Sequence, residues 1–295
     1  MTMKGLEDIM QDARAAECVR AALREDVGDG DATTLALVDA SARATGEILA
    51  RQACRVAGAT VAKAVLGAVD PELEVETLIP DGSDAAAGDA VLTVRGRAAS
   101  ILTAERTALN FMQRLCGIAT LTARFVTAVR EYGTLILDTR KTTPNLRLFE
   151  KYAVLCGGGA NHRFGLYDRI LMKDNHRRLW RGGDPDRLDL AVEAARKAYP
   201  ALAVEIEVES IEECQSALRA RPEWIMLDNM DCAMMRACVA LCKGVSRTEA
   251  SGGITLDRAR EVAATGVDAI SLGCLTHSAG SVDLSLEWRE DVLKF

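Results

Sequence analysis

The strongest constraint on the fold is a repeated pattern in the second half of the chain. From residue 133 onward, short apolar runs rich in β-branched residues alternate with segments of helical periodicity. Strands that alternate with helices indicate βαβ units and a parallel sheet. Six successive strands favour a β/α barrel, and a doubly wound open sheet is the alternative that periodicity leaves open. The predicted strands cover residues 134–137, 170–172, 204–208, 224–227, 248–250 and 269–272.

The first hundred or so residues have a different pattern. Their apolar runs are short, and the turns between them are rich in Gly, Asp and Pro, as a small layered α/β domain requires. A long helical stretch follows over residues 98–132, with a predicted break near Cys116 and Gly117. The amphipathic segment 281–295 is expected to pack back on the first domain.

The first residues of the sequence and the lengths of its apolar runs indicate the cellular location that we expect for the protein. Residues 1–10 contain Lys4, Glu7 and Asp8 and lack the apolar core of a signal peptide. No apolar run approaches the roughly 20 residues that cross a bilayer. We therefore expect a soluble, cytoplasmic protein that is not bound to a membrane.

A cationic segment stands out in an otherwise acidic chain. Residues 138–178 contain nine lysines and arginines but four acids, a net charge of +5, whereas the whole chain carries −7. A concentrated island of this kind suggests a site for a small, strongly anionic ligand. It argues against a nucleic-acid partner, which needs a broad basic face.

Polar residues follow nearly every predicted strand of the second half, where barrel enzymes build their active sites. Arginine forks suit carboxylates and phosphates, lysine supplies a point charge, and glycine turns such as Ser251-Gly252-Gly253 can form anion nests. Acids at the same rim can accept hydrogen bonds from sugar hydroxyls or hold Mg²⁺. No nucleophile arrangement and no P-loop is evident. The candidates are Arg140, Lys141, His162, Arg163, Lys173, Glu207, Asp228, Ser251, Gly252, Gly253 and Gly273.

Taken together, these motifs resemble the quinolinate phosphoribosyltransferases, the carboxylating nicotinate-nucleotide diphosphorylases of NAD biosynthesis. The long central motif is highly specific, and the matching segments occur in the family's order over residues 100–280. They are AERTALNFMQRLCGIAT, DTRKTTPNLRLFEKYAVLCGGGANHRFGLYDRILMKDNH, EIEVES, IMLDN, EASGGI and LGCLTHS. One departure is Asn145, where the family commonly has glycine; Asn tolerates a left-handed backbone, so the turn can survive.

The resemblance implies a fold and a reaction. It implies an N-terminal α/β sandwich, which we place at residues 1–110, and an incomplete, about seven-stranded β/α barrel at 111–280. It implies a homodimer or a higher assembly of dimers with shared active sites. The implied reaction joins quinolinate to phosphoribosyl pyrophosphate with Mg²⁺, giving nicotinate mononucleotide, pyrophosphate and CO₂.

The resemblance also implies roles for the residues that face quinolinate. Arg106 matches an arginine that reaches the substrate from the partner subunit. Arg140, His162 and Arg163 match residues that bind the substrate carboxylates. Lys173 matches a lysine that lies between the two substrates and contacts quinolinate.

Other matched positions face the phosphoribosyl substrate. Lys141 matches a second lysine between the substrates, and Glu207 and Asp228 match acids near the ribose and the metal. Lys141, Lys173, Glu207 and Asp228 form the predicted catalytic set. The phosphate loops match Ser251, Gly252, Gly253 and Gly273.

Three alternatives remain. A phosphoribosyltransferase of the same fold could act on another aromatic acid such as nicotinate, although several cations aimed at the acid favour a dicarboxylate. A group associated with molybdenum transport shares the RKT and HR elements, but the intact LMKDNH with Lys173 favours the quinolinate enzymes. A non-catalytic anion-binding protein is the third.

Overall fold

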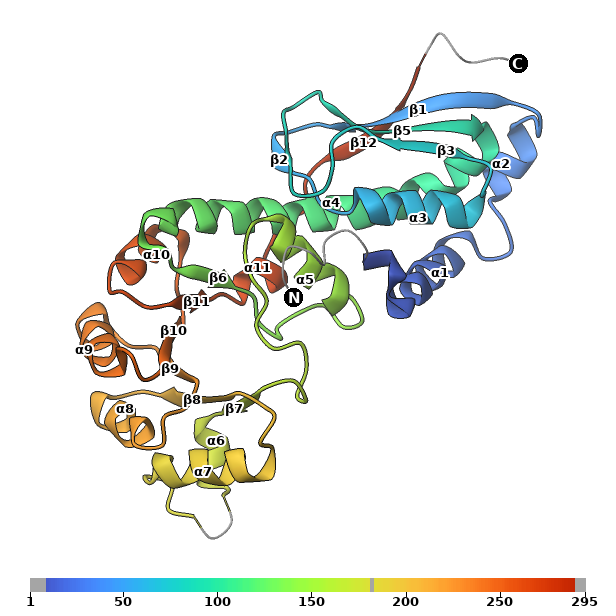
Figure 1. Ribbon diagram of the computed structural model, residues 1–295. Helices are drawn as coiled ribbons and strands as arrows, with labels where there is room; N and C mark the ends of the chain where they lie inside the picture. The colour runs from blue at the N-terminus through green and yellow to red at the C-terminus, as the bar shows by residue number, and fades with distance from the viewer. Residues whose placement is uncertain (1–8, 181–182, 290–295) are drawn as a thin grey trace. The chain divides into compact units, whose positions relative to one another are not determined.

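The computed structural model describes residues 9–180 and 183–289, which divide into two compact units (Figure 1). Within these ranges, the first unit comprises residues 9–123, 142–159 and 274–289, and the second comprises 124–141, 160–180 and 183–273. The boundary predicted between residues 110 and 111 falls inside helix α4 (Ala98–Val129). Because each unit is made of more than one segment, the chain passes between the two units more than once.

The first unit is built on an antiparallel sheet with the strand order β12-β1-β5-β3. Helix α3 lies along this sheet together with the first part of α4, and α1 packs against α3 (Figure 1). The strands are β1 (Arg43–Ala50), β3 (Glu74–Thr77), β5 (Ala90–Arg97) and β12 (Leu284–Trp288), with a separate pair β2 (Cys54–Arg55) and β4 (Asp84–Ala85). The helices are α1 (Ala13–Val27), α2 (Ala32–Leu37), α3 (Ala59–Val69), α5 (Arg147–Cys156) and α11 (Cys274–His277).

The segment predicted to pack back does so as a strand. β12 pairs with β1 in antiparallel register, from Gly46 opposite Trp288 to Ala50 opposite Leu284. Strand β5 pairs with the other edge of β1. The first strand of the chain therefore lies between β5 and β12, the last described strand. Residues 290–295 lie outside the described residues.

The break predicted in the long helix near Cys116 and Gly117 is wrong, because α4 runs unbroken to Val129. Gly117 has a packing role instead. A Cβ atom there would lie 1.9 Å from the carbonyl oxygen of Gly280. The missing side chain therefore lets the 280 loop lie directly on the helix.

The second unit is a parallel sheet with the order β6-β11-β10-β9-β8-β7. From β7 to β11 each strand is added beside the previous one in one direction, which is singly wound barrel topology and excludes the doubly wound alternative. The strands are β6 (Leu135–Leu137), β7 (Ile170–Met172), β8 (Val204–Val208), β9 (Trp224–Asp228), β10 (Arg247–Ser251) and β11 (Ala269–Ser271). The helices are α6 (Asp174–Arg178), α7 (Leu188–Ala198), α8 (Ile211–Leu218), α9 (Cys232–Cys242) and α10 (Leu256–Ala263).

The incomplete barrel predicted from the sequence is confirmed. Six strands form the described ladder, and the seventh position is reduced to one parallel bridge between Leu137 and Ala160. The chain turns into this bridge through Gly158, whose φ of 83° favours glycine, and the amide of Ala160 donates to Ile136. The residues just after the bridge are thereby fixed beside the carboxyl end of β6.

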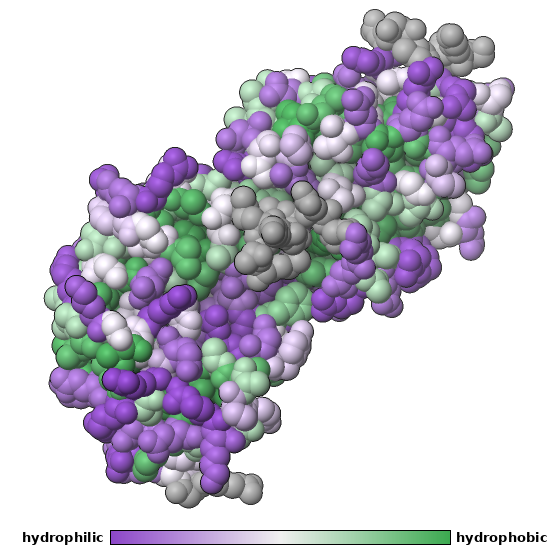
Figure 2. Space-filling view, in the orientation of Figure 1, coloured by the Kyte–Doolittle hydropathy of each residue, from purple (hydrophilic) through white to green (hydrophobic). Residues whose placement is uncertain are grey.

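The outer helices of the second unit are amphipathic. Leu188, Ala191 and Val192 of α7 are buried, while hydrophilic side chains cover much of the outward face around α7 (Figure 2). Strand β8 buries charged side chains as well as apolar ones. Glu205 and Glu207 lie on one side of the sheet, and Val204 and Ile206 lie on the other. No helix within the described ranges combines the length and apolarity that a membrane span needs.

Candidate active site

Six of the predicted strand-end residues of the second unit line one cavity of about 300 Å³, whereas the predicted Glu207, Asp228, Gly252, Gly253 and Gly273 are not in its lining. Each wall comes from the carboxyl end of a strand or from the loop after it, which is where parallel barrels place their ligands. Four cationic side chains and two large apolar ones share its lining. Its lining comprises Thr139, Arg140, Lys141, His162, Arg163, Leu171, Lys173, Met226, Glu249, Ser251 and Ser271.

A buried aspartate holds the cationic loops in place. Asp138 follows β6 directly and is fully buried. Its carboxylate accepts hydrogen bonds from the Asn161 side chain at 2.6 Å and from the His162 backbone N–H at 2.9 Å. The Arg140–Lys141 loop and the His162–Arg163 loop are therefore joined at their base.

The arginines of the cavity lie close enough to affect each other. Burial lowers the pKa of Arg163, and the neighbouring Arg140 guanidinium lowers it further. Arg163 also donates to the backbone carbonyl of Arg169 at 3.2 Å. Two guanidiniums held together in a partly buried place create a strong preference for an anion.

Lys173 follows β7 and forms an ion pair with Glu207 of β8. Asp228 ends the next strand, and its register partner on β10 is Ser251. Burial raises the pKa of Asp228, and the charge of Glu209 raises it too, against an opposing effect of Lys173. Glu207 and Asp228 are absent from the cavity lining but stand beside it on adjacent strands.

Glu207 and Asp228 have the chemistry that Mg²⁺ requires. Mg²⁺ prefers oxygen ligands and is usually held by one or two carboxylates together with substrate phosphates and water. The bond from Lys173 occupies Oε2 of Glu207, and the Asn229 side chain donates to Asp228 at 2.8 Å. Each carboxylate has further lone pairs, so the two acids fit such an ion.

The loop after β10 has a backbone that favours glycine, and the anion nest suggested from the sequence stays a prediction. Gly252 and Gly253 both have positive φ, of 100° and 57°. A Cβ atom on Gly252 would lie 2.1 Å from the side-chain oxygen of Asn229, so the loop also requires glycine for close approach. Gly273 lies two residues after β11.

A buried group of one histidine and two glutamates lies next to Arg163. His162 Nε2 is 3.1 Å from Glu205 of β8 and 3.4 Å from Glu249 of β10. Arg169 reaches Glu205 at 3.2 Å. Burial raises the pKa of Glu205, but His162 and Arg169 outweigh it, so that the pKa is lowered. Burial raises the pKa of Glu249, and the charge of Glu205 adds to the effect.

The proton of His162 lies on Nε2. The backbone N–H of Arg163 donates to Nδ1 at 2.8 Å, which requires Nδ1 to carry no proton. Burial lowers the pKa of His162, but the neighbouring carboxyl groups of Glu205 and Glu249 raise it to about 9, which would make the ring cationic. The two observations differ on the ring's charge. We favour the neutral ring, because a proton on Nδ1 would break a buried hydrogen bond.

Arg106 is the one predicted residue in the first unit, where it lies exposed on α4. The sequence interpretation did not assign Glu205 and Glu249, although both lie in quoted motifs. The signal that could have found them is a glutamate inside an otherwise apolar buried strand, where an acid needs a partner.

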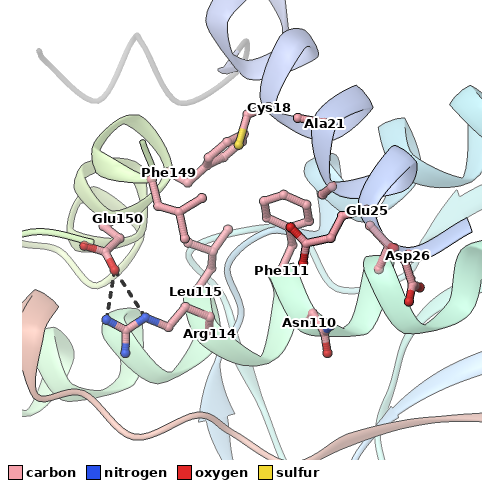
Figure 3. Close-up of a pocket in the computed structure, with 13 residues that line it drawn as sticks. Cys18, Ala21, Glu25, Asp26, Asn110, Phe111, Arg114, Leu115, Phe149 and Glu150 are labelled. Atoms are coloured by element: carbon pink, nitrogen blue, oxygen red, sulfur yellow. Dashed lines mark hydrogen bonds and ion pairs between the residues drawn. The ribbon is translucent and has the colours of Figure 1, made fainter. Parts of the chain in front are cut away.

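A second cavity, of about 340 Å³, lies in the first unit between α1, α4 and α5 (Figure 3). Its one arginine, Arg114, bonds Glu150 and the backbone carbonyls of Ala279 and Thr276. Glu25 and Asp26 of α1 line the same cavity. Its acids disfavour an anionic ligand, so the barrel cavity is the candidate active site.

A singly wound barrel with a cationic cavity and glycine turns at its strand ends belongs to the class of β/α-barrel enzymes that act on small anionic substrates. Within that class, the N-terminal domain model of quinolinate phosphoribosyl transferase matches residues 31–116, and its C-terminal domain model matches residues 118–287. The chain belongs to the quinolinate phosphoribosyltransferase family, as the sequence motifs predicted.

Named relatives agree with this assignment. The chloroplastic nicotinate-nucleotide pyrophosphorylase [carboxylating] of Oryza sativa is 40% identical over 285 residues, covering 91% of this chain and 76% of the relative. The mitochondrial quinolinate phosphoribosyltransferase [decarboxylating] 2 of Nicotiana glauca is 39% identical over 287 residues, covering 92% and 81%. The structure of the Francisella tularensis nicotinate-nucleotide pyrophosphorylase superposes with a TM-score of 0.87 at 36% identity, covering 94% of this chain and 96% of that one.

Proposed function

We propose that this chain transfers the phosphoribosyl group of phosphoribosyl pyrophosphate to quinolinate and releases pyrophosphate and CO₂, giving nicotinate mononucleotide. The observation that carries the proposal is the gathering of Arg140, Lys141, Arg163 and Lys173 around one cavity. Quinolinate has two carboxylates and its co-substrate has a phosphate and a pyrophosphate, so the pair needs this density of positive charge. The names of the relatives support the same reaction.

The cations in the cavity have separate tasks in this proposal. Arg140 and Arg163 bind the carboxylates of quinolinate, and His162 completes that wall. Lys141 and Lys173 lie between the substrates, where they hold the leaving pyrophosphate and the acid in line. Fixing both reactants in one geometry removes much of the entropic barrier to their reaction.

The phosphate and ribose contacts come from the later strands. Ser251, Gly252, Gly253 and Gly273 offer hydroxyl and backbone donors to the 5-phosphate, and Glu207 and Asp228 face the ribose hydroxyls. When Mg²⁺ is bound through Glu207 and Asp228, it supplies positive charge to the departing pyrophosphate. Loss of pyrophosphate leaves positive charge on the ribose, and the pyridine nitrogen forms the new bond to C1.

The proposal extends to the assembly and the compartment. We place the enzyme in the cytoplasm as a homodimer or an assembly of dimers, with Arg106 entering the site of the neighbouring subunit. Exposure of Arg106 on α4 of the first unit supports this role.

The decisive measurement is turnover of quinolinate against nicotinate by the purified chain, with phosphoribosyl pyrophosphate and Mg²⁺ present. We expect pyrophosphate, CO₂ and nicotinate mononucleotide from quinolinate, and little product when Mg²⁺ is chelated. Faster turnover of nicotinate would overturn the proposed substrate.

A matched pair of variants tests the cavity. Arg140→Ala is expected to lower kcat/KM at least about 30-fold, because truncating one side of a desolvated charge pair costs about 2–5 kcal/mol. Arg247→Ala is the control, since Arg247 begins β10 at the opposite end of the strand, beside Trp224. Equal activities of the two variants would contradict the site assignment.

A further inference from the structure

We propose that the side chain of Glu249 donates the proton that replaces CO₂ on the pyridine ring. The inference rests on the proposed function and adds a catalytic residue to it. Glu249 is not among the site residues predicted from the sequence.

The proposed reaction requires a proton at a defined atom. When the bond between C2 and its carboxylate breaks, CO₂ departs and the electron pair stays on C2, next to the positively charged ring nitrogen. In this proposal the C2–H bond forms while the C2–carboxylate bond is breaking, so loss of CO₂ and arrival of the proton share one transition state. A carboxyl O–H can supply this proton, and the carboxylate that remains takes the electron pair of the broken O–H bond.

Glu249 is placed to reach that atom. It lines the same cavity as Arg140 and Arg163, which hold the carboxylates of the substrate in this proposal. The residue is fully buried on strand β10, which ends at Ser251. Because it precedes Ser251 of the proposed phosphate loop by two residues and shares the cavity with Arg163, the proposal places the reacting carbon beside its carboxyl group.

The partners of Glu249 distinguish it from Glu205, the other buried glutamate next to His162. Among the residues that the structure describes, the one basic side chain in close contact with Glu249 is the neutral ring of His162, at 3.4 Å. Glu205 contacts both His162 and Arg169 and is held as a carboxylate. Glu249 therefore lacks the cation that would keep it ionised.

Its surroundings also favour the neutral acid. Burial raises the pKa of Glu249, and the nearby charge of Glu205 raises it further. Burial without a cation disfavours the ionised form of a carboxyl. Glu249 therefore enters the reaction with its proton in place.

Apolar side chains border Glu249 in the cavity. Met226 lies beside Glu249 in the register of β9 and β10, and both Met226 and Leu171 line the cavity. With substrate bound over these apolar side chains, a fixed acid is a better proton source than solvent. Lys173 is already engaged with Glu207. After product leaves, Glu249 regains a proton from water that enters the open cavity.

The test compares Glu249→Gln with Glu205→Gln, since both glutamates are buried and both contact His162. Pyrophosphate release and CO₂ release from carboxyl-labelled quinolinate are measured in single turnovers. We expect Glu249→Gln to slow CO₂ release at least about tenfold while pyrophosphate release changes little, because a positioned general acid contributes about 10²–10⁴-fold. Glu205→Gln is expected to slow both steps together by disturbing His162 and Arg169.

A second readout follows the proton itself. In an equal mixture of H₂O and D₂O, the hydrogen at C2 of the product records the isotope preference of its donor. We expect this ratio to differ between the wild-type chain and Glu249→Gln. If the glutamine variant does not fold, Glu249→Asp replaces it, with slower CO₂ release, an unchanged pyrophosphate step and the wild-type isotope ratio as the expected result.

Three outcomes are decisive. Unchanged CO₂ release and an unchanged isotope ratio in Glu249→Gln would overturn the proton donor alone. Parallel loss of both steps in either Glu249 variant would make Glu249 a structural residue. A wild-type chain that released no pyrophosphate with quinolinate would overturn the proposed function and this inference with it.

Discussion

Gly252 occupies a position that a residue with a Cβ atom cannot fill without displacing Asn229. The two residues meet where β9 and β10 end, next to Asp228. Both have left-handed backbones, with φ of 100° for Gly252 and 54° for Asn229. The contact therefore fixes the loop that carries the proposed phosphate donors.

We expect Gly252→Ala to lower kcat/KM at least about tenfold. The new Cβ atom must push Asn229 away from Asp228, and a left-handed backbone costs a side chain roughly 1–2 kcal/mol. Gly253→Ala is the matched comparison, because its φ is 57° but nothing lies within 4 Å of the added atom. We expect it to lose less activity. Equal losses in steady-state kinetics would show that the clash with Asn229 is unimportant.

Single residues also mark the limit of what the sequence predicted. Charged residues that directly follow apolar runs can be recognised from the sequence alone. This is how the candidates Arg140, Lys141, Arg163 and Lys173 could be found. Glu249 was not assigned, because its significance depends on which strand lies opposite and on which cations come near. Asn145 shows the reverse case: a left-handed turn was predicted from its residue type, and its φ is 66°.

Among the elements, α4 shows how a local signal can mislead. Glycine in a helix usually weakens it, so a break near Gly117 was a reasonable prediction. Tertiary packing decides otherwise, because the missing side chain admits the Gly280 backbone. Strands were predicted more reliably than this helix, since the buried parallel strands β8 and β9 have a continuous pattern of burial.

Gly117→Ala is expected to destabilise the protein by about 1–3 kcal/mol, the usual cost of overpacking. The Cβ atom would force the 280 loop from α4 and strain the start of β12. Gly67→Ala is the control, since Gly67 lies in α3 with no atom within 4 Å of an added Cβ. We expect that change to stabilise by roughly 0.5–1 kcal/mol. Denaturant unfolding measures both, and a stable Gly117→Ala variant would contradict the packing role.

At the scale of the whole molecule, the proposed shared site makes a quantitative prediction. Arg106→Ala and Lys173→Ala are each expected to be inactive as pure proteins. After subunit exchange, half of the dimers carry one of each chain, and one of their two sites is intact, so about a quarter of wild-type activity should return. Tagged subunits verify the exchange. No recovery in the exchanged mixture would place Arg106 outside the active site.

The assignment of chain segments to the two units was the part of the architecture least accessible from the sequence. The predicted division at residue 110 allowed for the return of residues 281–295 to the first unit, but not for the return of residues 142–159. Within the described residues, the first unit takes back both 142–159 and 274–289. The return of residues 142–159 depends on α5 finding partners far away in the chain, which no local pattern encodes.

The pairing of β12 with β1 has a consequence during synthesis. The ribosome produces β1 early, but one edge of that strand has no partner until Leu284–Trp288 has been made. The second unit lies between these two strands in the chain and needs neither of them for its own sheet. We therefore expect the nascent polypeptide to form its barrel before the sheet of the first unit is complete. During that time the unpaired edge of β1 is exposed, and it is there that chaperones would bind or misfolded pairings would form.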